Sequence, residues 1–251
     1  MGDVGGWSTI ESDEGVFTSL IETLGVQNVQ FEELISLDAD TIRSLGSVYG
    51  VIFLFKWTRE AAGARAEAPI DGTYDETAAE NNVFFAAQTI QNACGTQAIL
   101  SVILNHDNPP KPLPAIPLGT ELASFKDFTT GFPPELRGEA LSNSEAIRTA
   151  HNTFAKSQYP PEETHFNLMA VVQDPRPRAR EIGDAETLER EERKRAAWQW
   201  ENTLRRWNFV GFIGEMMKGV AGAKERDGKY DEWVDAAKAE TRKKIESRRG
   251  A

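Results

Sequence analysis

Residues 84–104 read FFAAQTIQNACGTQAILSVIL. From Cys94 onward the apolar residues recur at helical spacing as far as Leu104, and a polar run followed by Pro109 and Pro110 stops the pattern. The segment therefore predicts a helix that begins close to Cys94. A thiol at that place meets the positive end of the helix dipole and unpaired amide donors, and both stabilise a thiolate.

A glutamine stands six residues before this cysteine. The side chain of Gln88 can fold back across the turn, so its amide and the backbone N–H of Cys94 can donate to an oxyanion that develops during acyl transfer. The alternative interpretation is structural: Cys94 is a small buried apolar residue, which is the more common role of a cysteine at a helix start.

The composition limits the classes of protein to which this chain can belong. The chain has 251 residues, 40% of them hydrophobic, which suits one large domain or one domain with a helical appendage. Its net charge of -11 disfavours nucleic-acid binding. A single cysteine excludes a disulfide framework and a multi-thiolate zinc site. We expect no metal, no cofactor, no membrane segment and no secretory signal, and hence a cytoplasmic and nuclear protein.

The rest of the pattern mixes helices with short strands. Ser12 reads as the N-cap of a helix that ends at Gly25, and a shorter helix runs from Asp38 or Asp40 to Gly46. Residues 51–55 predict a strand buried on both faces at the centre of a sheet, and residues 165–172 predict a second strand. Loops are expected at 58–82 and 109–117, and helices at 125–150, 181–206 and toward the end of the chain.

Gln88 and the run NACGTQA at 92–98 resemble the active-site signature of the ubiquitin C-terminal hydrolases, a family of cysteine deubiquitinases. The resemblance continues through ESDEGVF at 11–17, GVIFLFKW at 50–57, LSNS at 141–144, HNTFA at 151–155 and FNLMAVV at 166–172. RRWNF at 205–209 is similar to the helical extension of the proteasome-associated branch.

The resemblance implies an α+β, papain-like fold with an antiparallel sheet flanked by helices, followed by an all-α extension. It implies a catalytic domain over residues 1–174 and a partner-docking extension over 175–251. Cys94 would attack the carbonyl of the ubiquitin C-terminal glycine, with Gln88 stabilising the transition state. The implied partners are ubiquitin and its conjugates, and a proteasomal ubiquitin receptor or a chromatin-remodelling complex.

The chain departs from the family between Gln158 and Tyr159. There the family has a crossover loop and the segments that hold the catalytic histidine and its orienting aspartate, and the fold is therefore expected to be incomplete. Of the three histidines present, His106 precedes two prolines, His151 lies in a helical match, and His165 begins a strand that matches a different family strand. The general base and its orienting acid are thus absent from the family positions.

Three interpretations follow from this departure. A gene model or transcript that lost an exon of a deubiquitinase needs no new biology. A catalytically inactive ubiquitin- or proteasome-binding protein is the alternative function, and an engineered deletion is the third possibility. Losing a member of a catalytic triad lowers the rate by several orders of magnitude, so we expect little turnover from this chain.

Overall fold

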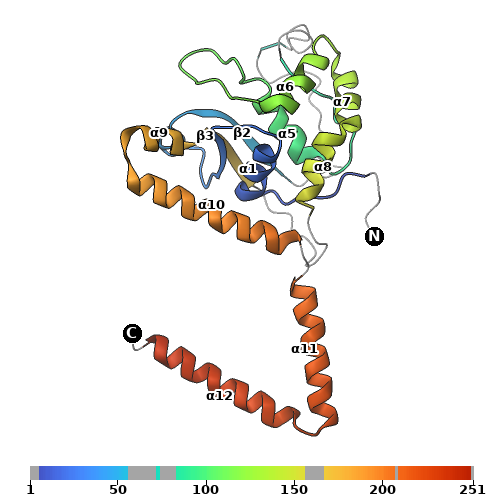
Figure 1. Ribbon diagram of the computed structural model, residues 1–251, viewed down its shortest axis with the longest axis vertical. Coiled ribbons are helices and arrows are strands. Elements are labelled where there is room, and N and C mark those ends of the chain that lie inside the picture. The colour runs from blue at the N-terminus through green and yellow to red at the C-terminus, as the bar shows by residue number, and fades with distance from the viewer. Residues whose placement is uncertain (1–5, 56–71, 74–82, 156–166, 207–208, 250–251) are drawn as a thin grey trace. The chain divides into compact units, whose positions relative to one another are not determined.

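The computed structural model describes residues 6–55, 72–73, 83–155, 167–206 and 209–249. The chain divides into two compact units, residues 1–206 and 207–251 (Figure 1). The first unit holds α1 (Glu14–Thr23), β1 (Val29–Glu33), α2 (Ala39–Ser44), β2 (Val48–Leu54), α5 (Cys94–Ile103), α6 (Gly119–Phe128), α7 (Pro134–Asn143), α8 (Glu145–Thr153), β3 (Asn167–Gln173), α9 (Pro175–Ile182) and α10 (Ala185–Arg206). The second unit holds α11 (Phe209–Arg226) and α12 (Tyr230–Arg249). The α+β class is confirmed.

The sheet of the first unit has the strand order β1-β3-β2, and both pairings are antiparallel. Met169 and Val171 of β3 face the main core, while Ala170 and Val172 face a smaller cluster on the opposite side, and all four are buried. β3 is therefore the central strand in the described part of the chain.

The prediction that residues 51–55 lie at the centre of the sheet is wrong. β2 is an edge strand of the described sheet, and Val51 and Phe53 are 40% and 54% exposed. Of residues 51–55, only Ile52 is buried. No layer of described residues covers the face of β2 that carries Val51 and Phe53, and the sequence pattern by itself reveals neither which faces of a strand are covered nor how many neighbours it has.

The helix predicted after Cys94 is α5, and it packs on β2. Ile99, Leu100 and Ile103 are fully buried in the main core. Where α5 crosses β2, a Cβ on Gly50 would lie 3.0 Å from a methyl group of Val102, so the bare backbone of the strand permits the close approach. The buried face of α5 fixes the position of its first residue, Cys94.

Two short polar caps start the N-terminal helices. Asp13, not Ser12, caps α1, since its Oδ1 accepts hydrogen bonds from the backbone amides of Gly15 at 2.8 Å and Val16 at 3.1 Å. Asp38 caps α2 in the same way. The cap of α1 therefore lies one residue after the predicted position. The carboxylate of Asp13 accepts from the free amides as effectively as the hydroxyl of Ser12 would.

The helices expected over residues 125–150 are the end of α6 together with α7 and α8. Ser144 ends α7 and caps α8, accepting a 3.4 Å hydrogen bond from the amide of Ile147. Residues 109–117 form the predicted loop without regular structure. Most of the loop predicted at 58–82 and the first residues of the strand predicted at 165–172 lie outside the described residues.

The predicted helix at 181–206 is α10, which lies along α1 through polar contacts (Figure 1). Buried Arg195 donates to Gln30 at 3.1 Å and to Asp174 at 3.2 Å, and it also pairs with Glu22. Burial acts to raise the pKa of Asp174, but hydrogen bonds from Arg176 and the charge of Arg195 outweigh it and hold that pKa below its usual value.

The far half of α10 contacts the start of α1. The ring of Trp198 occupies the space that a Cβ on Gly15 would need, at 2.6 Å. Arg205 donates to Glu11 at 2.7 Å and to the capping residue Asp13 at 2.8 Å. α9 and α10 thus belong to the first compact unit. The assignment of residues 1–174 to catalysis and 175–251 to partner docking concerns function and stays a prediction.

The second unit consists of the helices α11 and α12. A groove lined by apolar and basic side chains runs over the two helices, and large apolar side chains of α11 stand exposed: Phe212, Ile213, Met216, Met217 and Val220. Across the described residues, no helix is both long and apolar enough to cross a membrane.

Candidate active site

Cys94 is the first residue of α5, and its thiol is exposed. The preceding residue, Ala93, is the N-cap, and its side chain makes no capping hydrogen bond to the amides at the start of the helix. Asn92 has a φ of 66°, a left-handed conformation that turns the chain sharply into α5. Because Cys94 is exposed, the alternative interpretation of this residue as a small buried apolar side chain is wrong.

The segment that leads to Gln88 is bonded to α5 and to the residues just after it. Asn105 of the α5 end holds Phe84 by two hydrogen bonds, accepting from its amide at 2.7 Å and donating to its carbonyl at 2.9 Å. Nearer the site, Gln97 of α5 donates from its Nε2 to the carbonyl of Ala86 at 2.5 Å. These bonds tie the stretch before Gln88 to the helix that bears Cys94.

α7 supports the same segment from the other side. The amide of Ala87 donates to the carbonyl of Pro134 at 2.8 Å, and a Cβ on Gly138 would lie 2.3 Å from the carbonyl oxygen of Ala87. Only glycine allows this approach. Arg137 donates from Nη1 to the carbonyl of Val83 at 2.8 Å, and burial lowers the pKa of its guanidinium. Gln88 itself is exposed, as is Cys94, so both predicted site residues face solvent.

Gln97, Asn105 and Gly138 support this segment, and the sequence motif does not indicate that role. Gln97 and Asn105 lie three and eleven residues after Cys94, spacings that place them near the same face of a helix as Cys94. This spacing is only a weak indication that they support the site. Gly138 lies within a helix, where glycine is unfavourable, and that cost is the signal for a close approach.

The two described histidines hydrogen-bond to groups other than the thiol. His106 lies just beyond the C-terminal end of α5 and its Nδ1 donates to the carbonyl of Val102 at 2.7 Å. Because α5 has ten residues, its two ends are roughly 15 Å apart. His151 is fully buried, with Nε2 at 2.6 Å from the carbonyl of Ser8 and Nδ1 at 2.7 Å from the hydroxyl of Thr96.

Burial lowers the pKa of His151, although the hydrogen bond to Ser8 opposes the shift. With both ring nitrogens occupied, this histidine has no free atom to take a proton from a thiol. His165 lies outside the described residues. No group of three or more metal-binding side chains gathers anywhere in the part of the chain that the structure describes.

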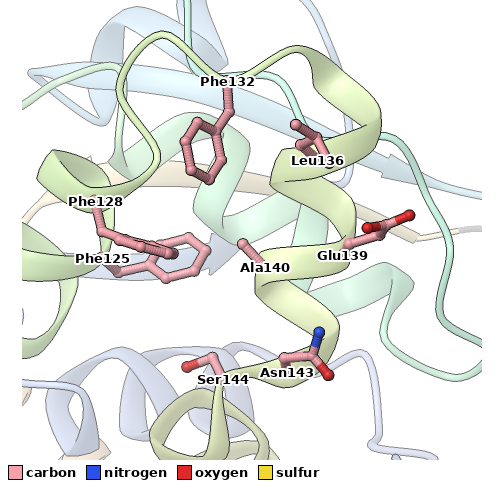
Figure 2. Close-up of a pocket in the computed structure, with 8 residues that line it drawn as sticks. All are labelled: Phe125, Phe128, Phe132, Leu136, Glu139, Ala140, Asn143 and Ser144. Carbon is pink, nitrogen blue, oxygen red and sulfur yellow. The ribbon is translucent and has the colours of Figure 1, made fainter.

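A separate apolar pocket of about 440 Å³ lies between α6 and α7. Figure 2 shows Phe125 and Phe128 of α6, Phe132 of the connecting turn and Leu136 of α7 around it. Phe128 is 66% exposed. The lining residues include neither Cys94 nor Gln88, so this pocket is distinct from the Cys94 site.

An exposed thiol on the first residue of a helix packed against an antiparallel sheet is the layout of a cysteine hydrolase. The model of the family described as ubiquitin carboxyl-terminal hydrolase, family 1, matches residues 7–193, and a second model, described as ubiquitin carboxyl-terminal hydrolases, matches residues 182–225. The chain belongs to the ubiquitin carboxyl-terminal hydrolase family, which makes it a thiol protease by family. The assignment from the motif is confirmed.

Curated relatives agree with this assignment. Ubiquitin carboxyl-terminal hydrolase 2 of Schizosaccharomyces pombe is 36% identical over 303 residues, covering 93% of this chain and 97% of the relative. Ubiquitin carboxyl-terminal hydrolase isozyme L5 of Dictyostelium discoideum is 45% identical over 172 residues, which cover 64% of this chain and 45% of the relative. The first alignment is longer than the 251 residues of this chain, so it includes positions that this chain lacks.

A solved structure shares the fold. The catalytic domain of Trichinella spiralis UCH37, bound to ubiquitin vinyl methyl ester, superposes with a TM-score of 0.55 at 31% sequence identity. The superposition covers 68% of this chain and 97% of that domain. The predicted α+β fold of the ubiquitin C-terminal hydrolase type is thus confirmed.

Proposed function

We propose that Cys94 is the nucleophile of a deubiquitinase site and that Gln88 donates to the oxyanion. The observation that carries this proposal is the exposed thiol at the uncapped start of α5, beside a segment that holds Gln88 through bonds to α5 and α7. The solved relative bound to a ubiquitin electrophile supports ubiquitin as the substrate.

The reaction is acyl transfer. The thiolate of Cys94 forms a bond to the carbonyl carbon of the ubiquitin C-terminal glycine, and the carbonyl oxygen becomes an oxyanion that the Gln88 amide and the Cys94 backbone N–H stabilise. The oxyanion collapses, the C–N bond breaks, and the leaving amine takes a proton. Water then cleaves the thioester to release a carboxylate and the thiol. Both stages need a group that moves a proton.

We further propose that this chain lacks that group. His106 and His151 are committed to other hydrogen bonds, and the longer alignment with the fission yeast relative is consistent with a missing internal segment. The exposed edge of β2 is consistent with it too, because apolar strands of this kind are usually covered. The alternative function is then an inactive ubiquitin- or proteasome-binding protein, arising from a truncated isoform or gene model.

The second unit is proposed to dock a partner. The apolar residues of this unit are sparse for a helical pair that folds by itself. Those exposed on α11 suit a protein interface. A proteasomal ubiquitin receptor or a chromatin-remodelling complex is the partner implied by the family resemblance. A cytoplasmic and nuclear location belongs to the same proposal.

The test treats the full chain with ubiquitin that carries an electrophilic C-terminus, beside Cys94→Ala and Gln88→Ala. A covalent adduct that depends on Cys94 and slows with Gln88→Ala supports the site, whereas no adduct from a folded sample contradicts it. A circular dichroism melt establishes that each sample is folded.

Turnover is measured separately with ubiquitin linked to a fluorescent leaving group. An adduct without turnover supports the missing base, since labelling needs the thiol and the oxyanion donors but no repeated proton transfer. Turnover within about tenfold of an intact relative assayed in parallel would overturn the proposal that the base is absent, because loss of a triad member costs on the order of 10⁴-fold or more.

A further inference from the structure

A short extended segment, residues 6–10, crosses the end of α8 and is here called the strap. Asn152 holds it by two hydrogen bonds, accepting from the amide of Ser8 at 2.9 Å and donating to the carbonyl of Gly6 at 3.0 Å. Ile10 adds an antiparallel bridge to Ala155. The strap is therefore fixed to α8 at several points, although about 145 residues separate the two in sequence.

His151 links the strap to the helix of the nucleophile. A carbonyl oxygen only accepts, so the 2.6 Å contact with Ser8 places the ring proton on Nε2. Nδ1 of the neutral ring is then an acceptor, and the hydroxyl of Thr96 in the first turn of α5 donates to it at 2.7 Å. One imidazole thus connects the strap with a residue two positions after Cys94.

The strap also contacts the turn before Cys94. Asn92, the left-handed residue of that turn, donates from Nδ2 to the carbonyl of Trp7 at 3.2 Å. Behind the turn, Ile10 lies 3.8 Å from the position of a Cβ on Gly95. Both sides of Cys94 are therefore held by the same five-residue segment, on one side through Asn92 and on the other through Thr96 and His151.

This restraint compensates for a weak local structure. The turn contains a non-glycine residue at positive φ, and α5 begins without a side-chain cap, so neither feature fixes the turn by itself. A nucleophile must be held within a fraction of an ångström of its productive position. Tertiary bonds supply what the local sequence does not.

We propose that His151 is a positioning residue for Cys94, acting as a neutral bridge between the strap and Thr96. The proposal takes from the proposed function only that Cys94 is the reacting group. It assigns His151 no proton transfer, and it explains why a histidine near the nucleophile in the fold is buried and fully hydrogen-bonded.

The test compares hydrogen–deuterium exchange of the full chain with that of His151→Phe, His151→Gln and the matched control His106→Gln. Phe keeps a ring but bonds neither partner, whereas the terminal amide of Gln can donate to Ser8 and accept from Thr96. We expect His151→Phe to speed exchange of the hydrogen-bonded amides of Ser8 and Gln97 by roughly ten- to a hundredfold, the effect of losing one or two buried hydrogen bonds. His151→Gln should restore most of the protection.

His106 lies at the opposite end of α5, so His106→Gln should leave exchange at Ser8 and Gln97 unchanged. The rate at which iodoacetamide alkylates Cys94, the sole cysteine, is the second readout, and it should change at least threefold in His151→Phe and return with Gln. Exchange that rises evenly over the whole first unit, or equal protection in Phe and Gln variants, would overturn the proposal. Neither readout needs ubiquitin, so a failed ubiquitin adduct would count against the proposed function alone.

Discussion

The substitution Gly138→Ala adds one methyl group at the contact between α7 and the segment that holds Gln88. The new Cβ would lie 2.3 Å from the carbonyl oxygen of Ala87 and 3.3 Å from its carbonyl carbon. Ordinary contact requires about 1 Å more, and the obstacle is backbone, which cannot rotate away as a side chain can. Either α7 or the segment must move.

The expected cost follows from this displacement. Overpacking of this kind costs about 1–3 kcal/mol, and moving Ala87 from Pro134 weakens a backbone hydrogen bond worth about 1 kcal/mol. Alanine returns about 0.5–1 kcal/mol because it favours a helix more than glycine does. We expect the free energy of unfolding to fall by about 1–3 kcal/mol, with slower labelling by the ubiquitin electrophile because Gln88 shifts.

Urea unfolding followed by tryptophan fluorescence measures the stability change, and adduct formation on a gel measures the labelling rate. Gly214→Ala in α11 is the control, since its Cβ meets nothing within 4 Å and should cause no loss of stability. A Gly138→Ala protein as stable as the parent, labelled at the same rate, would refute the assigned contact and with it the role of α7 in holding Gln88.

Three further predictions concern the core, the charge network and pH. Ile99→Ala should lower the free energy of unfolding by about 2–5 kcal/mol in urea, because its side chain is fully buried in the main core. Arg195→Ala should cost about 3–5 kcal/mol, because it leaves Asp174 buried without one of its cations, while the exposed pair at Arg178 tolerates Arg178→Ala within about 1 kcal/mol. The native pKa of His151 lies below the ordinary 6.5, so the unfolded chain binds the proton first and stability should fall as pH drops below about 6.5. Urea midpoints between pH 8 and pH 5 should decline less in His151→Gln than in the parent, and an equal decline would contradict this assignment.

Local pattern was enough to predict the helix at Cys94, because its apolar spacing continues for three turns and its end is marked by prolines. It was also enough to predict the strand β3. Alternate side chains of β3 point to opposite faces of the sheet, and both faces are buried. It failed for β2, since a strand's neighbours come from distant parts of the chain. The cap of α1 was missed by one residue, because Ser12 and Asp13 are both good caps and only geometry distinguishes them.

The roles of Cys94 and Gln88 stay a prediction, and the residues that hold them in place could not be predicted from the sequence. Cys94 and Gln88 stand in a recognisable order, but the bonds that hold them join residues up to about 145 positions apart, and no periodicity encodes such pairs. His151 shows the difference. In the sequence it is one of three candidate bases, and in the fold it is a neutral connector.

The single, exposed thiol has a practical consequence for anyone who handles the protein. With no second cysteine in the chain, air oxidation can form a disulfide only between two molecules, and each such pair blocks both Cys94 side chains. Titration with a chromogenic disulfide therefore gives the reactive fraction of a preparation directly, because one thiol per molecule corresponds to a fully reduced sample.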